Sequence, residues 1–282
     1  MKRRIGAHVS ISKGLRESLP KALRIGANCM QIFSSPPQSF TPPHFTDEEC
    51  ESFRKLALEV DIQPVFIHAL YLANLSSDDE GLRVKSVKSL IADMIFCEKI
   101  GGAGVIVHTG SHKGRGFEVS LVETKKSLSE ILAATPETSN LYLEIACGNA
   151  GKVGQNFQEL KKLLEIGNSP RLRICLDTAH MFANGYAFDT QEKVDRLVQE
   201  IETNVGWHNV SCVHVNDSKV NCGGLRDQHE NIGSGYIGRD AFRMLLNHER
   251  LKTLPLIIET PGFDDQGPDK QNLDILKSIL EG

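Results

Sequence analysis

Six short apolar runs in this sequence carry a metal-capable side chain at their last or next-to-last position. The runs cover residues 65–68, 105–108, 141–144, 174–177, 212–215 and 256–259, and the side chains are those of His68, His108, Glu144, Asp177, His214 and Glu259. Imidazoles and carboxylates are unfavourable to bury without partners, so an ordinary core gives no reason for them to recur at one end of six strands. Both groups bind divalent transition metals. The pattern predicts a metal site of several ligands.

Two further segments add three candidate ligands. His180 follows Asp177 by three residues, and Asp227 and His229 alternate across Gln228, so that in an extended backbone their side chains point the same way. The full set is five histidines and four carboxylates: His68, His108, His180, His214, His229, Glu144, Asp177, Asp227 and Glu259. Mixed nitrogen and oxygen ligands without cysteine suit Zn²⁺ or Mn²⁺ in a catalytic site. Nine ligands are too many for one ion and suit two or three ions with one bridging carboxylate.

Taken singly, these residues have plainer interpretations. His68 resembles a hydrogen-bonded residue at a strand end. Asp177 is a suitable helix N-cap, with His180 facing solvent, and residues 227–229 resemble a solvated loop. The joint arrangement favours metal binding, because independent accidents would not all fall at the same end of a strand. Three histidines lie outside the pattern and are expected on the surface: His44, His208 and His248.

The elements that must position these ligands follow a repeat. Residues 5–9 and 29–33 also form apolar β-runs, which brings the number to eight, spaced roughly 25 to 45 residues apart with helical patterns between them. Residues 46–49 and 77–80 resemble capping boxes at helix starts. Repeated βα units predict a (β/α)8 TIM barrel, a single domain over residues 1–282, with its active site at the carboxyl end of the strands.

Composition and charge limit the classes of protein to which this chain can belong. The chain has 282 residues, 40% of them hydrophobic and 24% charged, which is ordinary for a soluble globular protein. No apolar run is long enough to cross a membrane, residues 1–8 are not followed by an apolar signal segment, and seven cysteines form no Cys-x-x-Cys pair. We expect a cytoplasmic protein with reduced thiols. A net charge of −4 with no basic run is unusual for a DNA-binding protein, but each divalent ion offsets two carboxylate charges, so a phosphodiester substrate is not excluded.

Six ordered motifs across essentially the whole chain resemble the endonuclease IV family of apurinic/apyrimidinic endonucleases. They cover residues 6–10 (GAHVS), 108–112 (HTGSH), 176–180 (LDTAH), 214–219 (HVNDSK), 232–238 (IGSGYIG) and 258–260 (IET). The resemblance implies a (β/α)8 barrel with three Zn²⁺ ions per chain, or Mn²⁺ at one site. By it, His68 and His108 hold one ion; Asp177, His214 and Glu259 hold a second; Glu144 bridges these two; and His180, Asp227 and His229 hold the third.

The resemblance also implies a reaction and a partner. The expected reaction is hydrolysis of the phosphodiester 5′ to an abasic site in duplex DNA, leaving a 3′-hydroxyl, with a metal-bridging hydroxide as nucleophile and Glu144 in the catalytic role. Such enzymes flip the target nucleotide out of the helix, which is easier when its base is missing. We expect a monomer with no membrane association and no obligate protein partner.

Four residues are expected to contact DNA. Tyr71 and Leu72 match the position from which the family inserts side chains beside the lesion, although Tyr71 also suits packing at the barrel end. After the second strand the family commonly has Asn, Arg and Trp, whereas here Pro36, Gln38 and Phe40 follow, so one DNA-contacting cation is absent. Arg226 stands where the family often has two arginines.

Two other functions fit parts of the pattern. A sugar isomerase or epimerase on a xylose-isomerase-like barrel would use Glu144, Asp177, His214 and Glu259 for one Mn²⁺ or Mg²⁺, but it gives no reason for the remaining ligands. A non-catalytic module that binds damaged DNA would be favoured by broken ligand positions, and none is broken. Metal content separates the first alternative from the endonuclease, and turnover separates the second.

Overall fold

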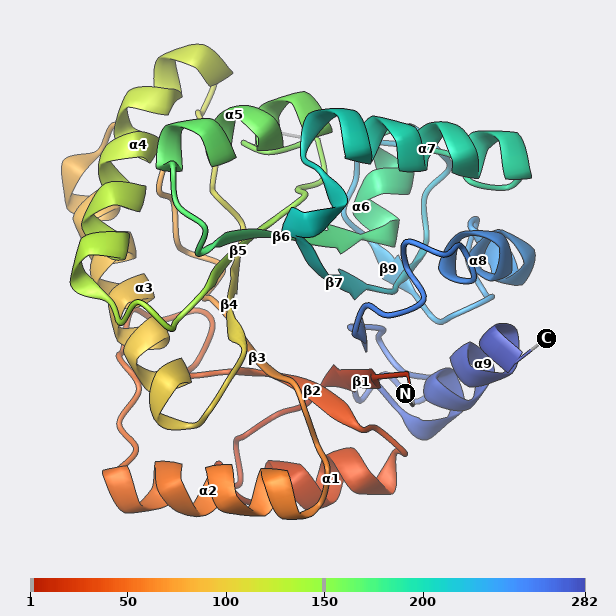
Figure 1. Ribbon diagram of the computed structural model, residues 1–282, viewed down its shortest axis with the longest axis horizontal. Helices are drawn as coiled ribbons and strands as arrows, with labels where there is room; N and C mark the ends of the chain where they lie inside the picture. The colour runs from red at the N-terminus through yellow and green to blue at the C-terminus, as the bar shows by residue number, and fades with distance from the viewer. Residues whose placement is uncertain (1–2, 149–150, 282) are drawn as a thin grey trace.

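The computed structural model describes residues 3–148 and 151–281, and its centre is a closed barrel of parallel strands. The strands are β1 (Ile5–His8), β2 (Cys29–Phe33), β3 (Val65–His68), β4 (Gly104–Val107), β5 (Leu141–Glu144), β6 (Leu172–Asp177), β7 (Val210–His214) and β10 (Leu256–Ile258). They pair in sequence order, and β10 closes the ring against β1. Figure 1 shows the strands at the centre with the helices around them. The predicted (β/α)8 barrel is confirmed.

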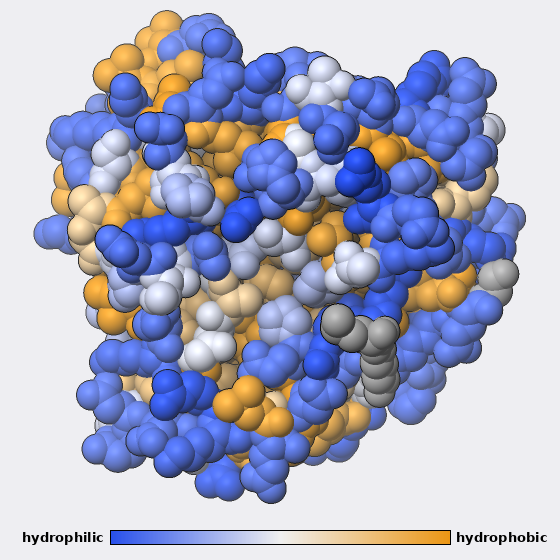
Figure 2. Space-filling model, viewed as in Figure 1, coloured by the Kyte–Doolittle hydropathy of each residue, from blue (hydrophilic) through white to orange (hydrophobic). Residues whose placement is uncertain are grey.

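Helices follow the strands and cover the outside of the barrel. They are α1 (Ser18–Arg24), α2 (Asp47–Glu59), α3 (Glu80–Lys99), α4 (Phe117–Ala134), α5 (Phe157–Gly167), α6 (Thr178–Ala183), α7 (Gln191–Asn204), α8 (Gly238–Leu246) and α9 (Lys270–Glu281), with a 3-10 turn, η1 (Trp207–Asn209). In the described residues, a two-stranded antiparallel sheet, β8 (Asp217–Ser218) and β9 (His229–Glu230), follows β7. Hydrophilic residues cover most of the face in Figure 2, and hydrophobic ones show in small groups between them.

One predicted capping box forms and the other does not. The Thr46 side chain accepts a hydrogen bond from the Glu49 backbone, and the Glu49 side chain accepts one from the Thr46 backbone, so α2 begins as the sequence predicts. The box predicted at residues 77–80 is wrong. Asp79 is the N-cap of α3 and accepts from the Leu82 backbone, while the Ser77 hydroxyl, two residues earlier, accepts from the Asp79 backbone. Asp79 is an equally good cap, and it lies closer to the first apolar residue.

The barrel interior is filled by side chains that point inward at alternate strand positions. One inner layer is apolar and consists of Cys29, Phe66, Ile106, Tyr142, Cys175, Cys212 and Ile257. Gly6 takes the corresponding place on β1, where a Cβ atom would lie 1.9 Å from the Cys29 carbonyl oxygen. Two residues further along each strand, the side chains point inward again, because strand side chains alternate with a period of two. That second inward layer is polar and lies at the carboxyl end of the barrel.

Three expectations on exposure and membrane association can be compared with the structure. Cys29, Cys175 and Cys212 are buried as small apolar residues, and Cys222 is exposed on a loop. His44 and His208 are exposed and His248 is half-buried. In residues 3–148 and 151–281, no helix is long and apolar enough to cross a membrane.

Candidate metal centre

The polar layer of the barrel is a ring with one side chain from each strand or from the residue after it. Its members are His8, Gln31, His68, His108, Glu144, Asp177, His214 and Glu259. Each follows a residue of the layer below by two positions. The six strand-end ligands predicted from sequence therefore face one another across the barrel. Within the described residues, candidate ligand atoms fall into three groups, each with its atoms within 4.8 Å of one another.

The first group contains His68, His108 and Glu144. The Nε2 atoms of His68 and His108 lie 3.2 Å and 3.5 Å from the same Glu144 oxygen, Oε2. The Nδ1 atom of His68 lies 2.7 Å from the Ala69 carbonyl oxygen. Donation of the Nδ1 proton to that carbonyl leaves the Nε2 lone pair of His68 directed at Glu144, which is the tautomer that binds a metal.

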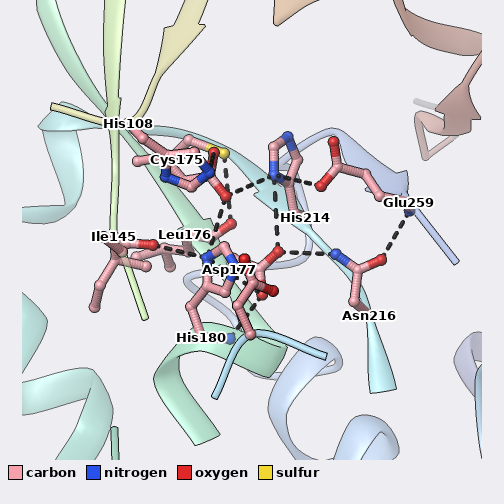
Figure 3. A network of polar contacts seen from close by, with 12 residues as sticks. His108, Ile145, Cys175, Leu176, Asp177, His180, His214, Asn216 and Glu259 are labelled. Atoms are coloured by element: carbon pink, nitrogen blue, oxygen red, sulfur yellow. Dashed lines mark hydrogen bonds and ion pairs between the residues drawn. The ribbon is translucent and has the colours of Figure 1, made fainter. Parts of the chain in front are cut away.

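The second group contains Glu144, Asp177, His214 and Glu259. The Nδ1 atom of His214 lies 3.1 Å from Glu144 Oε1, 3.3 Å from Glu259 Oε2 and 3.8 Å from Asp177 Oδ2. Figure 3 shows the side chains of Asp177, His214 and Glu259 converging on one another. Glu144 belongs to both groups, with Oε2 toward the first and Oε1 toward the second. A carboxylate that presents one oxygen to each of two groups is placed to bridge two ions.

The third group contains Asp177, His180 and His229, with Asp227 beside it. The Nδ1 atom of His180 hydrogen-bonds to the Ile145 carbonyl oxygen at 2.9 Å, and in the described part of the chain the buried Nε2 atoms of His180 and His229 make no hydrogen bond of good geometry. Asp227 Oδ1 lies 3.2 Å and 3.3 Å from these two Nε2 atoms. Two imidazole nitrogens that converge on carboxylate oxygens fit a divalent cation. The resemblance implies His180, Asp227 and His229 for the third ion. The structure adds Asp177, which belongs to both the second and the third group.

Two amides orient the ligands, and neither was identified from the sequence. The Gln31 side-chain carbonyl accepts from His214 Nε2 at 2.8 Å, and its NH₂ group lies 2.6 Å from Glu259 Oε1 and 2.9 Å from His8 Nδ1. Asn216 donates to Asp177 Oδ2 at 2.8 Å and accepts from the Glu259 backbone at 2.7 Å (Figure 3). Such outer contacts fix ligand tautomers and orientations. The period-two rule applied to β1 and β2 would have found His8 and Gln31.

Burial and mutual charge shift the titration of the ring. Burial raises the pKa of Glu144, but the imidazoles of His108 and His214 outweigh it and hold that pKa well below its usual range. Burial lowers the pKa of His108 to about 4. Burial also lowers the pKa of His214, yet the carboxylates of Glu259 and Glu144 raise it to about 10. Despite burial, Asp177 and Asp227 raise the pKa of His229 to about 9. The ring holds buried carboxylates that require positive charge.

We expect added zinc to stabilise the metal-free protein more at pH 8 than at pH 6. Protons on His214 and His229 stabilise the metal-free fold, since their pKa values are raised from 6.5 to about 10 and about 9. That contribution is complete below pH 6.5 and is lost as pH rises through 9 to 10. Zinc must displace these protons, and it does so more easily as pH rises. Thermal melts with and without zinc at both pH values measure the difference; an equal Tm shift would contradict the prediction.

The expected DNA-contacting residues lie on loops at the same end of the barrel. Tyr71 and Leu72 follow β3 and are 61% and 44% exposed. The Tyr71 ring lies 5.7 Å from the ring of His68 and 5.3 Å from that of Phe33, so it both packs at the barrel end and presents a surface. The Tyr71 backbone donates to the Pro37 carbonyl, which joins this loop to the loop after β2.

The other two expected contacts, Gln38 and Arg226, are exposed. Gln38 lies on the loop after β2, and Arg226 lies between β8 and β9, directly before Asp227. A cavity of 680 Å³ opens beside His8 between the loops after β1, β2 and β10. Lys21 and His44 are among the described residues that line it, and none of these residues is acidic.

Comparison with known proteins places the chain in a family. The family model of the xylose isomerase-like TIM barrels matches residues 19–279. A probable endonuclease 4 of Aquifex aeolicus is 39% identical over 98% of this chain and 97% of its own length, and one of Haloarcula marismortui is 38% identical over 92% of each. The crystal structure of endonuclease IV from Thermus thermophilus superposes with a TM-score of 0.86 at 34% identity, covering 99% of both chains. The chain belongs to the endonuclease IV family.

Membership of the endonuclease IV family agrees with the resemblance found in the sequence motifs. The barrel architecture is shared more widely. A D-tagatose 3-epimerase-like protein superposes with a TM-score of 0.75 at 21% identity, over 99% of this chain and 97% of the other. At that identity the likeness shows the fold alone. The difference between an endonuclease and a sugar epimerase must therefore be sought in the polar ring and the loops above it.

Proposed function

We propose that the protein is a zinc-dependent endonuclease that hydrolyses the phosphodiester 5′ to abasic sites in duplex DNA and leaves a 3′-hydroxyl. The observation that carries the proposal is the set of three ligand groups joined by two shared carboxylates, Glu144 and Asp177. A centre of this kind suits in-line displacement at phosphorus, where charge develops on the attacking and the leaving oxygen. Membership of the endonuclease IV family supports the same reaction.

Three sets of residues would each hold one ion. His68 and His108 would hold one, Asp177, His214 and Glu259 a second, and His180, Asp227 and His229 a third, with Mn²⁺ as an alternative to Zn²⁺ at one site. When bound, these ions supply the Lewis acidity that activates water and neutralises the phosphate.

Other residues of the chain fix the geometry. Glu144 presents one oxygen to each of two groups and so sets their spacing. Gln31 and Asn216 hold His214, Asp177 and Glu259 in orientation.

The loops above the ring suit a duplex with a missing base. Tyr71 and Leu72 are exposed side chains that can enter a base stack, and Arg226 supplies a cation. The cavity beside His8 has no acidic residue in its described lining. Its lining therefore offers no carboxylate to repel a DNA phosphate, despite the net charge of −4. A nucleotide without its base leaves the helix at a smaller free-energy cost than a paired one. We further propose that the protein acts as a monomer in the cytoplasm, without an obligate protein partner.

A sugar epimerase and a non-catalytic DNA-binding module are disfavoured by the site. An epimerase needs only the second group, and it gives no reason for His180, Asp227 and His229 to converge. A binding module would not need Glu144 between two groups.

The functional test offers the protein the rival substrates in parallel. Zinc-loaded protein is incubated with a duplex carrying one abasic-site analogue, with the same duplex undamaged, and with ketohexoses. We expect one cut at the lesion, none in the undamaged duplex and no epimer by sugar chromatography. Epimerisation without cleavage would support the epimerase, and binding to the damaged duplex without either reaction would support the binding module.

We expect Gln38→Arg to tighten binding of an abasic duplex by roughly tenfold at low salt and by less at high salt. The new cation would lie on an exposed loop that is hydrogen-bonded to the Tyr71 loop, and a phosphate contact is screened by added salt. Fluorescence anisotropy at two salt concentrations measures the change, with Gln38→Met as a control for side-chain length. An affinity equal to that of the control at both salt concentrations would place this loop away from the duplex.

A further inference from the structure

The loop between β8 and β9 is exposed, yet it is held at the third ligand group. All of residues 221–228 are exposed, and the Lys219 backbone hydrogen-bonds to the Gln228 carbonyl at the base of the loop. Its tip is tied to α6, because the Gly223 and Leu225 backbones donate to the carbonyl oxygens of Phe182 and Ala183, each at 3.0 Å. α6 also carries His180 of the third group. The loop therefore has a fixed place beside the ligands.

Leu225 occupies this loop in an unfavourable backbone conformation. Its φ is +52°, a region that leucine rarely adopts because its Cβ atom approaches backbone oxygen. The other non-glycine residues with positive φ in the described chain are Asp61, Lys113, Asn168 and Asp265. Leu225 alone among these five is aliphatic. Its side chain is 47% exposed, so burial does not compensate for the strain. Glycine, which adopts positive φ without strain, stands at the two preceding positions, Gly223 and Gly224, but not at position 225.

The position of Leu225 puts it within reach of any DNA bound at the ligand groups. Two residues of chain span at most about 7 Å, so Leu225 lies within about that distance of Asp227, measured between Cα atoms. Arg226 between them is exposed, and it has no ion pair with a described carboxylate. A duplex whose phosphodiester lies at the third group would have its backbone close to this segment. An exposed apolar side chain beside an unpaired cation is complementary to a base stack beside a phosphate backbone.

We propose that Leu225 is a substrate-contacting residue that packs against the base stack beside the missing base, with Arg226 on the adjoining phosphate. This inference rests on the proposed function, because it takes damaged duplex DNA as the ligand. The faces of the bases that flank an abasic position lose a stacking partner. An apolar side chain can cover such a face, and a fixed backbone presents that side chain without an ordering cost at the moment of binding.

The thiol of Cys222 offers a direct test of contact in the unaltered protein. Cys222 is exposed three residues from Leu225, and the other six cysteines are buried. Zinc-loaded protein is alkylated with iodoacetamide alone, with an undamaged duplex, and with a duplex whose linkage 5′ to the abasic analogue is an uncut methylphosphonate. Mass spectrometry of the peptide that contains Cys222 follows the rate. We expect the damaged duplex to slow alkylation at least fivefold more than the undamaged one, and equal rates would overturn the proposal.

Substitution separates a contact from a structural role. Leu225→Gly is expected to leave Tm unchanged or raised by a few degrees, since it relieves strain, while weakening abasic-duplex binding about tenfold at equal metal content. Leu225→Met should restore binding to within about threefold of wild type. The matched control is Asn168→Gly, which relieves a φ of +42° in the connection from α5 to β6, at the amino end of the strands, and should leave DNA affinity unchanged.

The possible outcomes distinguish this inference from the proposed function. Unchanged DNA affinity in Leu225→Gly, or a lowered Tm with binding lost in proportion, would overturn the role of Leu225. If the wild-type protein cuts an abasic duplex and Leu225→Gly binds that duplex as tightly as wild type, this inference alone is overturned. A wild-type protein that cuts no abasic duplex overturns the proposed function, and with it the ligand assumed here.

Discussion

Replacing Glu144 by Gln is expected to reduce cleavage of an abasic duplex by on the order of 10³-fold, while binding of that duplex stays measurable. Glu144 Oε2 lies 3.2 Å from His68 Nε2, and Oε1 lies 3.1 Å from His214 Nδ1, so the carboxylate serves two ligand groups. An amide keeps the shape but loses the charge and one acceptor oxygen. Metal stabilisation of phosphoryl transfer amounts to several kcal/mol, and about 4 kcal/mol corresponds to that loss of rate.

Single-turnover cleavage and anisotropy binding measure the two effects separately. Glu118→Gln makes the same chemical change at the exposed start of α4 and should behave as wild type. Metal content is determined on each protein by emission spectrometry. If Glu144→Gln cut DNA at a near-normal rate with its full metal content, Glu144 would not bridge two ions.

The second large effect is expected from Asp227→Asn, which should lower metal content by about one ion per chain and cleavage by on the order of 10²-fold. Asp227 Oδ1 lies 3.2 Å and 3.3 Å from the Nε2 atoms of His180 and His229, so its charge is placed to hold a cation together with them. Loss of the charge weakens the third group but leaves Asp177 in it, so excess zinc should recover part of the rate.

A matched variant tests whether the effect belongs to the third group. Asp240→Asn removes a carboxylate from the exposed start of α8, where it pairs with Arg243. We expect it to keep the metal content and rate of wild type. An Asp227→Asn protein that also kept both would show that the third group does not hold a metal needed for cleavage.

The period of β-structure explains why so much of the site could be predicted from sequence. A parallel barrel brings the carboxyl ends of all its strands to one end, so residues at strand ends become neighbours without any knowledge of the loops. His68, Glu144, Asp177 and His214 end their strands, and His108 follows β4 directly. The same rule places His8 and Gln31 in the ring. They follow Gly6 and Cys29 by two positions, as the other ring members follow the inner apolar residues of their strands.

Features set by three-dimensional closure could not be predicted in this way. The sharing of Asp177 between two ligand groups depends on how α6 turns away from β6 and brings His180 back beside it. The positive φ of Leu225 depends on hydrogen bonds to α6, which no local sequence signal encodes. Exposure of Tyr71 likewise depends on the loop after β2. Loops over a barrel are fixed by such distant contacts rather than by periodicity.

The most direct test of the endonuclease assignment is the chemistry of the cut end. A duplex with one abasic-site analogue, labelled at the 5′ end of the damaged strand, is incubated with protein that has been exhaustively chelated and then reloaded with zinc or left metal-free. We predict a product that ends immediately 5′ to the lesion in a 3′-hydroxyl that a polymerase can extend, formed only by the reloaded protein. Cleavage by the metal-free protein, or a product with a 3′-phosphate or a 3′-sugar fragment, would contradict the account.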